Sequence, residues 1–411
     1  MDRLSLEWTN IGQLLEQAAT THADRPLLIF EGQAMTFGEV NRRVNRVANA
    51  LKGALRVHKG DRVSVMLPAG FDAPILWLAT AKLGATIVLT NTNVRQDDLA
   101  YLLSDAGTSQ IIIDPAFLPT LQQIGEQLRD LTEIIVTGEA VEGYSSFEDV
   151  VAGEAETFRI GDVADIDLAT IQYTSGAMGD PKGCMASHRY WLVMGSLVAE
   201  ACHLGPEDAL LTTQPFYQLD PQWMLMACLI SGAALVALPE ASPERFWETV
   251  QRHEVTVAYL PPSAQDMLMS QPENPMLEQG HHIRLALASG IDAAYHDGFE
   301  RRWGTAWREV FRMAEAGVAM IAPLDDTESV GSGALGVPVR TKEARVVDAS
   351  GADVADGVAG ELLLRGEPMM FGYWNKAEET GLALKGGWLQ TGDLVRRDEQ
   401  GRYYWVGRLE H

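Results

Sequence analysis

The sequence predicts an α/β fold with two α/β subdomains, whose mainly parallel sheets are sandwiched by helices, and a small distorted antiparallel β-barrel subdomain. Its 411 residues are too many for one compact core and predict two or three lobes. Helix and strand patterns alternate up to about residue 323, and only short strand-like runs follow. Such alternation is typical of parallel sheets covered by helices, so we place the subdomains at residues 1–165, 166–323 and 324–408.

The first two subdomains carry alternating periodicities. Apolar residues recur with helical spacing at residues 11–19, 37–51 and 71–82. Strand-like runs lie at residues 62–67, 86–89, 110–113, 132–136, 168–171, 210–213, 233–237, 255–259 and 285–288. The longest apolar stretch, residues 224–238, is interrupted by Ser231-Gly232 and is too short to span a bilayer. It predicts a buried helix that leads into a strand.

The third subdomain has a different pattern. Its strand-like runs lie at residues 344–347, 361–364, 394–397 and 403–406. Turn sequences such as Ser350-Gly351 and Gln400-Gly401 separate them. Short strands joined by Asp/Gly turns predict an antiparallel sheet or barrel that closes this end of the chain.

The composition is that of a globular protein with a strongly acidic surface. Hydrophobic residues make up 46% and charged residues 21% of the chain, and the formal net charge is −24. We expect this charge to repel nucleic acid and anionic lipid, so no nucleic-acid partner is predicted. Three widely spaced cysteines without a CxxC pair favour buried thiols in a reducing compartment. Residues 1–13 lack the apolar core of a signal peptide, so we expect a cytoplasmic protein without stable membrane insertion.

The most informative segment is residues 173–183, with the sequence YTSGAMGDPKG. Its backbone N–H groups and hydroxyls can surround a polyphosphate, and Lys182 adds positive charge. The segment does not match the pattern GxxxxGK[ST], because Gly183 follows the lysine. The alternative is a solvated Gly/Ser turn. A plain turn does not require eleven residues in a fixed order, so this is the weaker interpretation.

Several later runs extend this pattern in order. They are Gly360-Glu-Leu362, Arg365-Gly366, Gly372-Tyr-Trp-Asn375, Trp388-Leu-Gln-Thr-Gly-Asp393 and Tyr404-Trp-Val-Gly-Arg408. Together with residues 173–183 they resemble the acyl/aryl-CoA synthetase, adenylation-domain and luciferase superfamily of AMP-forming ligases, here its large amino-terminal domain. Residues 214–220, Phe246-Trp247 and residues 259–262 are similar, more weakly, to the carnitine/crotonobetaine-CoA ligase branch.

The resemblance implies a two-step reaction. Members activate a carboxylic acid with ATP to an acyl-adenylate and pyrophosphate, then transfer the acyl group to coenzyme A, with Mg²⁺ as cofactor. A carboxylate is a poor electrophile, and adenylation supplies a good leaving group. The protein must stabilise charge on the α-phosphate and hold the two reactants in line.

The resemblance also assigns the nucleotide site. Residues expected to bind the phosphates are Thr174, Ser175, Gly176, Gly179 and Lys182. Phe311 would stack on adenine, Glu315 would bind Mg²⁺, and Glu315 and Lys182 would be catalytic. Asp393 would accept hydrogen bonds from the ribose hydroxyls, and Arg408 would contact ribose or phosphate. A core phenylalanine, an exposed glutamate and a plain turn aspartate are the alternatives.

The acyl site is assigned in the same way. Ser289, Gly290 and Ile291 would line the adenine and acyl pockets, although a plain turn is almost as good an interpretation. Gln218, Trp223 and Met313 are expected to touch the acyl group, with core packing equally plausible for Trp223 and Met313. The small-molecule partners are therefore the carboxylic acid, ATP and coenzyme A, and a homodimer is compatible with the resemblance.

Some positions depart from the family pattern. Ala177 and Met178 replace two threonines, Arg312 replaces a glycine and Ala314 replaces a threonine. Relatives continue into a hinge and a small lid domain that carries a lysine, whereas residues 409–411 form only a hinge stub or tag remnant. We therefore expect binding of ATP and acid but slow adenylation. Alternatives are an amine or carrier-protein thiol as acceptor, or a non-catalytic nucleotide- or acyl-binding homologue.

Overall fold

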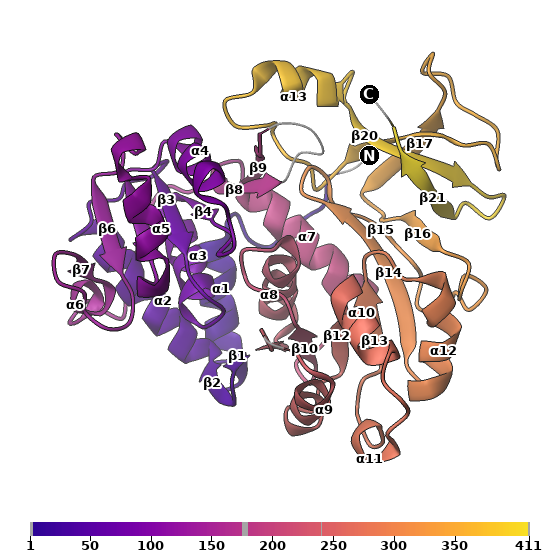
Figure 1. Ribbon diagram of the computed structural model, residues 1–411, viewed down its shortest axis with the longest axis horizontal. Coiled ribbons are helices and arrows are strands. Elements are labelled where there is room, and N and C mark those ends of the chain that lie inside the picture. Colours follow the sequence, from indigo (N-terminus) through magenta and orange to yellow (C-terminus); the bar gives the residue numbers. More distant parts are fainter. Residues whose placement is uncertain (1–2, 175–179, 240, 410–411) are drawn as a thin grey trace.

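The computed structural model describes residues 3–174, 180–239 and 241–409. Its described strands form two sheets, one of 14 strands and one of seven, and helices pack around them (Figure 1). The predicted α/β class is confirmed. The expected helices and strands are present at nearly the expected positions, because hydrophobic periodicity is a local signal.

The seven-stranded sheet has the order β7-β6-β5-β3-β4-β8-β9. Its strands are β3 (Arg62–Met66), β4 (Thr86–Leu89), β5 (Gln110–Ile113), β6 (Glu133–Val136), β7 (Ser145–Ser146), β8 (Leu168–Thr174) and β9 (Lys182–Ser187). Neighbouring helices are α1 (Ile11–Thr21), α2 (Phe37–Lys52), α3 (Asp72–Leu83), α4 (Gln96–Ala106), η1 (Pro115–Phe117), α5 (Leu118–Gln123), η2 (Gly125–Gln127) and α6 (Phe147–Val151). All pairs are parallel except β8 and β9, which form an antiparallel hairpin at one edge.

The larger sheet changes direction along its length. Its strands are β1 (Pro26–Phe30), β2 (Gln33–Thr36), β10 (Ala209–Thr212), β11 (Ala234–Ala237), β12 (Val257–Tyr259), β13 (Leu285–Ala288), β14 (Ala306–Met313), β15 (Gly317–Ile321), β16 (Ala334–Pro338), β17 (Lys342–Val347), β18 (Gly360–Gly366), β19 (Leu384–Lys385), β20 (Trp388–Arg397) and β21 (Tyr403–Arg408). Strand β14 is parallel to β13 through its first half and antiparallel to β15 through its second half. It therefore joins the parallel part to the antiparallel part.

The remaining helices belong to the middle and end of the chain. They are α7 (His188–Ala201), α8 (Leu219–Ser231), α9 (Pro243–Arg252), α10 (Pro262–Met269), α11 (Pro275–Glu278), α12 (Ala293–Trp303) and α13 (Ala377–Ala383). Helices α7 and α8 lie between the two sheets in Figure 1. Gly195 allows their close approach, because a Cβ there would lie 2.5 Å from the Cβ of Met226.

The two sheets exchange strands across the expected subdomain boundaries. The hairpin of β1 and β2 joins the large sheet through β11, with Leu28 opposite Leu235. Strands β8 and β9, which follow residue 165, complete the seven-stranded sheet. The boundary expected near residue 323 also falls within one hydrogen-bonded sheet, since β15 pairs with β16. Local periodicity predicts strands, but it carries no information about their partners.

A buried cluster of two indoles holds β8 against the helices. The Nε1 groups of Trp77 and Trp191 each donate a 3.0 Å hydrogen bond to Oγ1 of Thr170, and their rings meet edge to face. Both tryptophan side chains are fully buried. The strand that leads to residues 173–183 is thus attached to α3 and α7.

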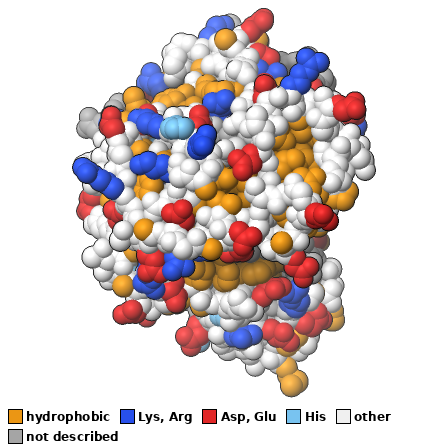
Figure 2. All heavy atoms as spheres, turned by 90° about the vertical axis from the view of Figure 1, so that its left-hand side faces the viewer, with side chains coloured by type: hydrophobic (Ala, Val, Ile, Leu, Met, Phe, Trp, Pro, Cys, Tyr) orange, Lys and Arg blue, Asp and Glu red, His pale blue; other side chains and the backbone are white. Residues whose placement is uncertain are grey.

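Surface and core features follow the composition. All three cysteines are buried free thiols, as predicted. No helix within the described ranges combines the length and apolar character needed to cross a membrane. Figure 2 shows acidic and basic side chains interspersed on one face, with apolar atoms between them. Mixing of this kind limits the single-sign electrostatic field of that face.

Candidate active site

A cleft of about 540 Å³ lies between the two sheets. The end of β8 contributes Thr174, the loop before α8 contributes Tyr217 and Gln218, and the end of β14 contributes Arg312 and Ala314. Carboxyl ends of parallel strands meet at one edge of a sheet, where ligands of α/β proteins bind. This cleft is therefore the candidate substrate site.

Lys182, Tyr373 and Glu315 form a contact chain beside this cleft. Thr174 and Lys182 are paired across β8 and β9, and Oγ1 of Thr174 donates to the Lys182 carbonyl at 3.4 Å. The Lys182 Nζ lies 5.2 Å from the ring centroid of Tyr373, which is a cation–π contact. The Tyr373 hydroxyl donates a 2.9 Å hydrogen bond to Oε1 of Glu315. One side chain thereby holds a cation over its ring and a carboxylate at its hydroxyl.

The surroundings of Tyr373 keep its hydroxyl protonated. Burial raises the pKa of Tyr373, the negative charge of Glu315 raises it further, and the charge of Arg408 opposes both. Tyr373 also forms a β-bridge with Cys184, and burial raises the pKa of that thiol. The tyrosine is thus a stable hydrogen-bond donor to Glu315.

Two further hydrogen bonds hold the turn before Glu315. The hydroxyl of Tyr190 donates to the Ala314 carbonyl at 2.9 Å, and the Met370 N–H donates to the Glu315 carbonyl at 2.8 Å. Tyr190 is buried in α7. The backbone that carries Glu315 is therefore tied to both α7 and the segment before Tyr373.

Asp393 and Arg408 form a pair on adjacent strands. They are register partners on β20 and β21, and Nη1 of Arg408 donates to Oδ1 of Asp393 at 2.8 Å. The Trp405 Nε1 donates to the same oxygen at 3.3 Å. The Asp393 side chain is 7% exposed, whereas that of Arg408 is 58% exposed. The pair joins a shielded acceptor to an accessible cation.

Glu309 organises the loop after β13. Its two carboxylate oxygens accept hydrogen bonds of 2.7 and 2.8 Å from the N–H groups of Gly290 and Ile291. Burial raises the pKa of Glu309 to about 7, although these two N–H donors act in the opposite direction. Gly290 has a φ of 82°, which favours glycine. The loop shape is therefore set by one buried carboxyl group.

Arg312 and Asp220 form a shielded ion pair at the cleft. Nε and Nη2 of Arg312 donate to the two oxygens of Asp220 at 2.7 and 2.6 Å. Asp220 also accepts a 2.9 Å hydrogen bond from Nε1 of Trp223. The Trp223 ring packs edge to face on Tyr259, with centroids 5.6 Å apart. The cleft wall at this position is thus polar, and Trp223 and Tyr259 support it from the core side.

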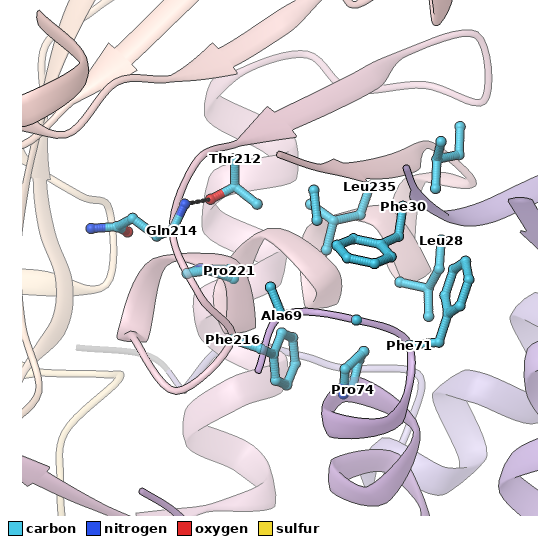
Figure 3. Close-up of a pocket in the computed structure, with 13 residues that line it drawn as sticks. Leu28, Phe30, Ala69, Phe71, Pro74, Thr212, Gln214, Phe216, Pro221 and Leu235 are labelled. Carbon is cyan, nitrogen blue, oxygen red and sulfur yellow. Dashed lines mark hydrogen bonds between the residues drawn. The ribbon is translucent and has the colours of Figure 1, made fainter. Parts of the chain in front are cut away.

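The loop of residues 213–218 lines both the cleft and a smaller apolar cavity of about 30 Å³, which Figure 3 shows. Phe216 and Pro221 line this cavity opposite Phe71, whereas Gln218 lines the cleft. The Gln214 N–H donates to Oγ1 of Thr212 at 3.2 Å, which is the contact drawn in Figure 3. The apolar cavity is too small for an organic acid, so the cleft on the Gln218 side is the better candidate.

Apart from Asp393, Arg408, Gly290 and Ile291, described above, the predicted site residues divide into three groups. Thr174 and Gln218 line the cleft, and Lys182 and Glu315 lie beside it through Tyr373. Phe311 and Met313 are half-buried and pack on the apolar cluster of the carboxy-terminal strands, Ser289 is half-buried, and Trp223 is completely buried in the core. Ser175, Gly176 and Gly179 lie outside the described residues, together with Ala177 and Met178.

Three residues of this site had no predicted role. Tyr373 lay in the Gly372-Tyr-Trp-Asn375 run without an assigned contact, and Asp220 ended the run of residues 214–220. Glu309 had a detectable signal, because it is an acidic residue among the four consecutive buried residues of β14, residues 307–310. Its hydrogen-bond partners lie about 20 residues away and could not be read from the sequence.

Comparison with known proteins shows the family of this chain. The family model described as AMP-binding enzyme matches residues 15–374. A 3-hydroxybenzoate–CoA ligase of Aromatoleum sp. is 28% identical over 394 residues, 94% of this chain and 74% of that protein. A crotonobetaine/carnitine–CoA ligase of Salmonella paratyphi C is 29% identical over 416 residues, 97% of this chain and 80% of that protein.

Solved structures are similar over nearly the whole chain. The anthranilate CoA ligase AuaEII in complex with anthranoyl-AMP superposes with a TM-score of 0.92 at 26% identity, covering 98% of this chain and 79% of that one. ATP-bound MatB from Rhodopseudomonas palustris has a TM-score of 0.86 at 26% identity, covering 97% and 79%. The family match spans well over half of the sequence, and the chain therefore belongs to the AMP-binding enzyme family.

Proposed function

We propose that this chain is an AMP-forming acid–CoA ligase, which activates a carboxylic acid with ATP and transfers the acyl group to coenzyme A. The observation that carries this proposal is the chain of contacts Lys182–Tyr373–Glu315 beside the cleft. It provides a cation for phosphate oxygens and a carboxylate for a metal ion at one place. In the first step, an oxygen of the substrate carboxylate attacks the α-phosphorus, the bond to the bridging oxygen breaks, and pyrophosphate leaves.

The nucleotide is proposed to lie across β14, β20 and the end of β8. Asp393 supplies a shielded acceptor for ribose hydroxyls, and Arg408 supplies an accessible cation for ribose or phosphate. The Gly290-Ile291 loop, shaped by Glu309, supplies backbone for the adenine end. MatB, a structural relative, is known in an ATP-bound form, which supports ATP as the nucleotide.

A Mg²⁺ ion fits the donors beside the cleft. Glu315 offers a carboxylate whose Oε1 is oriented by Tyr373. Across the described ranges, no three His, Cys, Asp or Glu side chains gather into a metal-binding group. A single carboxylate suffices for Mg²⁺, which takes its other ligands from phosphates and water. When bound, the ion would neutralise charge on the phosphates.

The acid is proposed to occupy the cleft beside Gln218 and Arg312. Two relatives act, by their names, on 3-hydroxybenzoate, which carries a neutral hydroxyl, and on crotonobetaine or carnitine, which carry a quaternary ammonium group. These names support a short polar acid for this chain as well. A cytoplasmic location and a homodimer stay predictions.

The test is pyrophosphate release over a panel of short carboxylic acids, with and without coenzyme A. We expect acid-dependent release that requires ATP and Mg²⁺, and acyl-CoA formation only when coenzyme A is present. The Lys182→Met variant should lower release, whereas Lys52→Met, on the exposed end of α2, should not. Acid-independent release, or release insensitive to Lys182, would contradict the proposal. The matched relatives are longer than this chain, so pyrophosphate release and thioester formation are to be measured separately.

A further inference from the structure

Arg312 is a charged side chain in the wall of the candidate acid site. It lies near the end of β14, directly after an irregularity in the pairing of β14 with β15. The Arg312 side chain is 27% exposed and lines the cleft together with Tyr217 and Gln218.

The guanidinium of Arg312 is fixed before any substrate arrives. Its Nε and Nη2 pair with both oxygens of Asp220, whose side chain is only 1% exposed. Trp223 and Tyr259 brace this pair from the core side, and Nη2 also lies 3.5 Å from the Tyr259 hydroxyl. A group held in this way loses little further conformational freedom when it binds a ligand.

One donor of the guanidinium is left for a ligand. Among the described residues, Nη1 of Arg312 has no hydrogen-bond partner, whereas Nε and Nη2 are both bonded. The positive charge is largely balanced, because Asp220 is paired with it and Glu309 lies close enough to interact with it. Arg312 thus offers a directed hydrogen-bond donor in a nearly neutral setting.

We propose that Arg312 is a specificity-determining residue that selects acids with an uncharged hydrogen-bond acceptor, a hydroxyl or carbonyl oxygen, remote from the carboxylate that is activated. The inference rests on the proposed function, since it assumes that the acid occupies this cleft. A cationic group would meet the guanidinium unfavourably. A second carboxylate would lie near Asp220 without a free counter-charge, which is costly in a shielded site.

Stable mimics of the acyl-adenylate test this inference on the chain as it is. The probes are 5′-O-(N-acylsulfamoyl)adenosines whose acyl groups form matched pairs, benzoyl against 3- or 4-hydroxybenzoyl, and butyryl against 3-hydroxybutyryl. Trimethylammonio- and carboxy-benzoyl probes complete the set. Because the adenosine part is shared, differences in Kd measured by calorimetry report the acyl site alone. We expect at least one hydroxyl probe to bind about tenfold or more tightly than its unsubstituted partner, the size of a hydrogen bond to a charged donor.

Variants connect this preference to Arg312. The double variant Asp220→Leu with Arg312→Met removes both charges together and avoids an unpaired buried carboxylate. It should lose the hydroxyl preference, measured as the ratio of the two Kd values within each matched pair, whatever its affinity for the unsubstituted probes. Arg312→Lys keeps the charge but not the planar fork, and should show a reduced preference. Arg302→Met, which breaks a shielded ion pair with Glu278 outside the cleft, is the control and should keep the full preference.

Three results would overturn the inference. They are equal binding of each matched pair by the unaltered protein, tightest binding of a charged probe, and a hydroxyl preference that survives in both Arg312 variants. Failure of every probe to bind would overturn the proposed function, and this inference with it. Binding of all probes without discrimination would overturn only the role of Arg312.

Discussion

Tyr373 donates a 2.9 Å hydrogen bond to Glu315 while its ring lies beneath the Lys182 ammonium. One side chain therefore links the two residues that the sequence proposed as catalytic. Within the described ranges Lys182 and Glu315 form no ion pair with each other, so their mutual arrangement depends on the tyrosine.

Removing only the Tyr373 hydroxyl should separate the contact of this residue with Lys182 from its hydrogen bond to Glu315. Tyr373→Phe keeps the ring beneath Lys182 but frees the Glu315 carboxylate. We expect the free energy of unfolding to fall by about 1 kcal/mol, the usual net worth of a hydrogen bond, and acid-dependent pyrophosphate release to fall several-fold. The free energy of unfolding and the rate of pyrophosphate release can both be measured on one preparation. The control is Tyr144→Phe, whose hydroxyl accepts from Gln122 away from the cleft. Full release by Tyr373→Phe would show that Glu315 needs no such support.

Glu315→Gln tests the proposed metal site. The glutamine carbonyl can still accept from Tyr373, but the charge that attracts Mg²⁺ is gone. We expect a several-fold rise in the Mg²⁺ concentration that gives half-maximal pyrophosphate release. Glu343→Gln, on the surface strand β17, is the control. An unchanged Mg²⁺ dependence would remove Glu315 from the metal site.

Asp393→Asn should weaken nucleotide binding without unfolding the protein. Charge-assisted hydrogen bonds are worth about 1.5–3 kcal/mol, so a loss of about tenfold in ATP affinity is expected by calorimetry. The ion pair with Arg408 adds little stability, because the arginine side chain is 58% exposed. Asp356→Asn disrupts a comparable exposed pair with Arg397 and should leave ATP affinity unchanged. A large drop in Tm with unaltered ATP affinity would assign Asp393 a structural role.

Thr170→Val tests the attachment of β8. Valine keeps the shape of threonine but leaves the indole N–H groups of Trp77 and Trp191 without their acceptor. Each buried donor left unpaired costs about 1–3 kcal/mol, so the free energy of unfolding should fall by at least about 2 kcal/mol. Denaturant titration measures it. Thr157→Val, at an exposed position, should change stability by less than about 0.5 kcal/mol. Equal stability of the two variants would mean that the indoles find other acceptors.

Glu309 should make stability depend on pH. Burial raises its pKa from 4.5 to about 7, so between these values the folded protein binds its proton more tightly than the unfolded chain. Stability should therefore be greatest below pH 4.5 as far as this group is concerned, and it should decline as pH rises to about 7. The full contribution of Glu309 to the free energy of unfolding is about 3 kcal/mol.

Glu309→Gln removes this ionisation and should flatten the decline. The measurement is the free energy of unfolding at several pH values from 4.5 to 8, compared between the two proteins. Glu126→Gln, at an exposed position, is the control and should reproduce the original slope. The same slope in Glu309→Gln would show that another group titrates in this range.

Much of the fold could be predicted because its signals are local. The strands at residues 86–89, 110–113 and 285–288 have the predicted bounds, since each is a short apolar run. The pairing of Leu28 with Leu235 could not be predicted, because strand partners more than 200 residues apart leave no periodic trace. For the same reason the expected subdomain boundaries do not coincide with the sheets.

The sequence by itself determined the family and the chemical types of Lys182, Glu315 and Gln218, because these depend on residue identity and order. The phosphate-binding role of residues 173–183 stays a prediction. Only the tertiary structure decided that Tyr373 links Lys182 to Glu315, that Glu309 holds the loop after β13, and that Arg312 faces the cleft with Asp220 behind it. The physical reason is the distance, in sequence or in space, over which each kind of signal acts. Periodicity and motif chemistry act between residues near in sequence, whereas hydrogen bonds and ion pairs act over about 3 Å in space and join residues from anywhere in the chain.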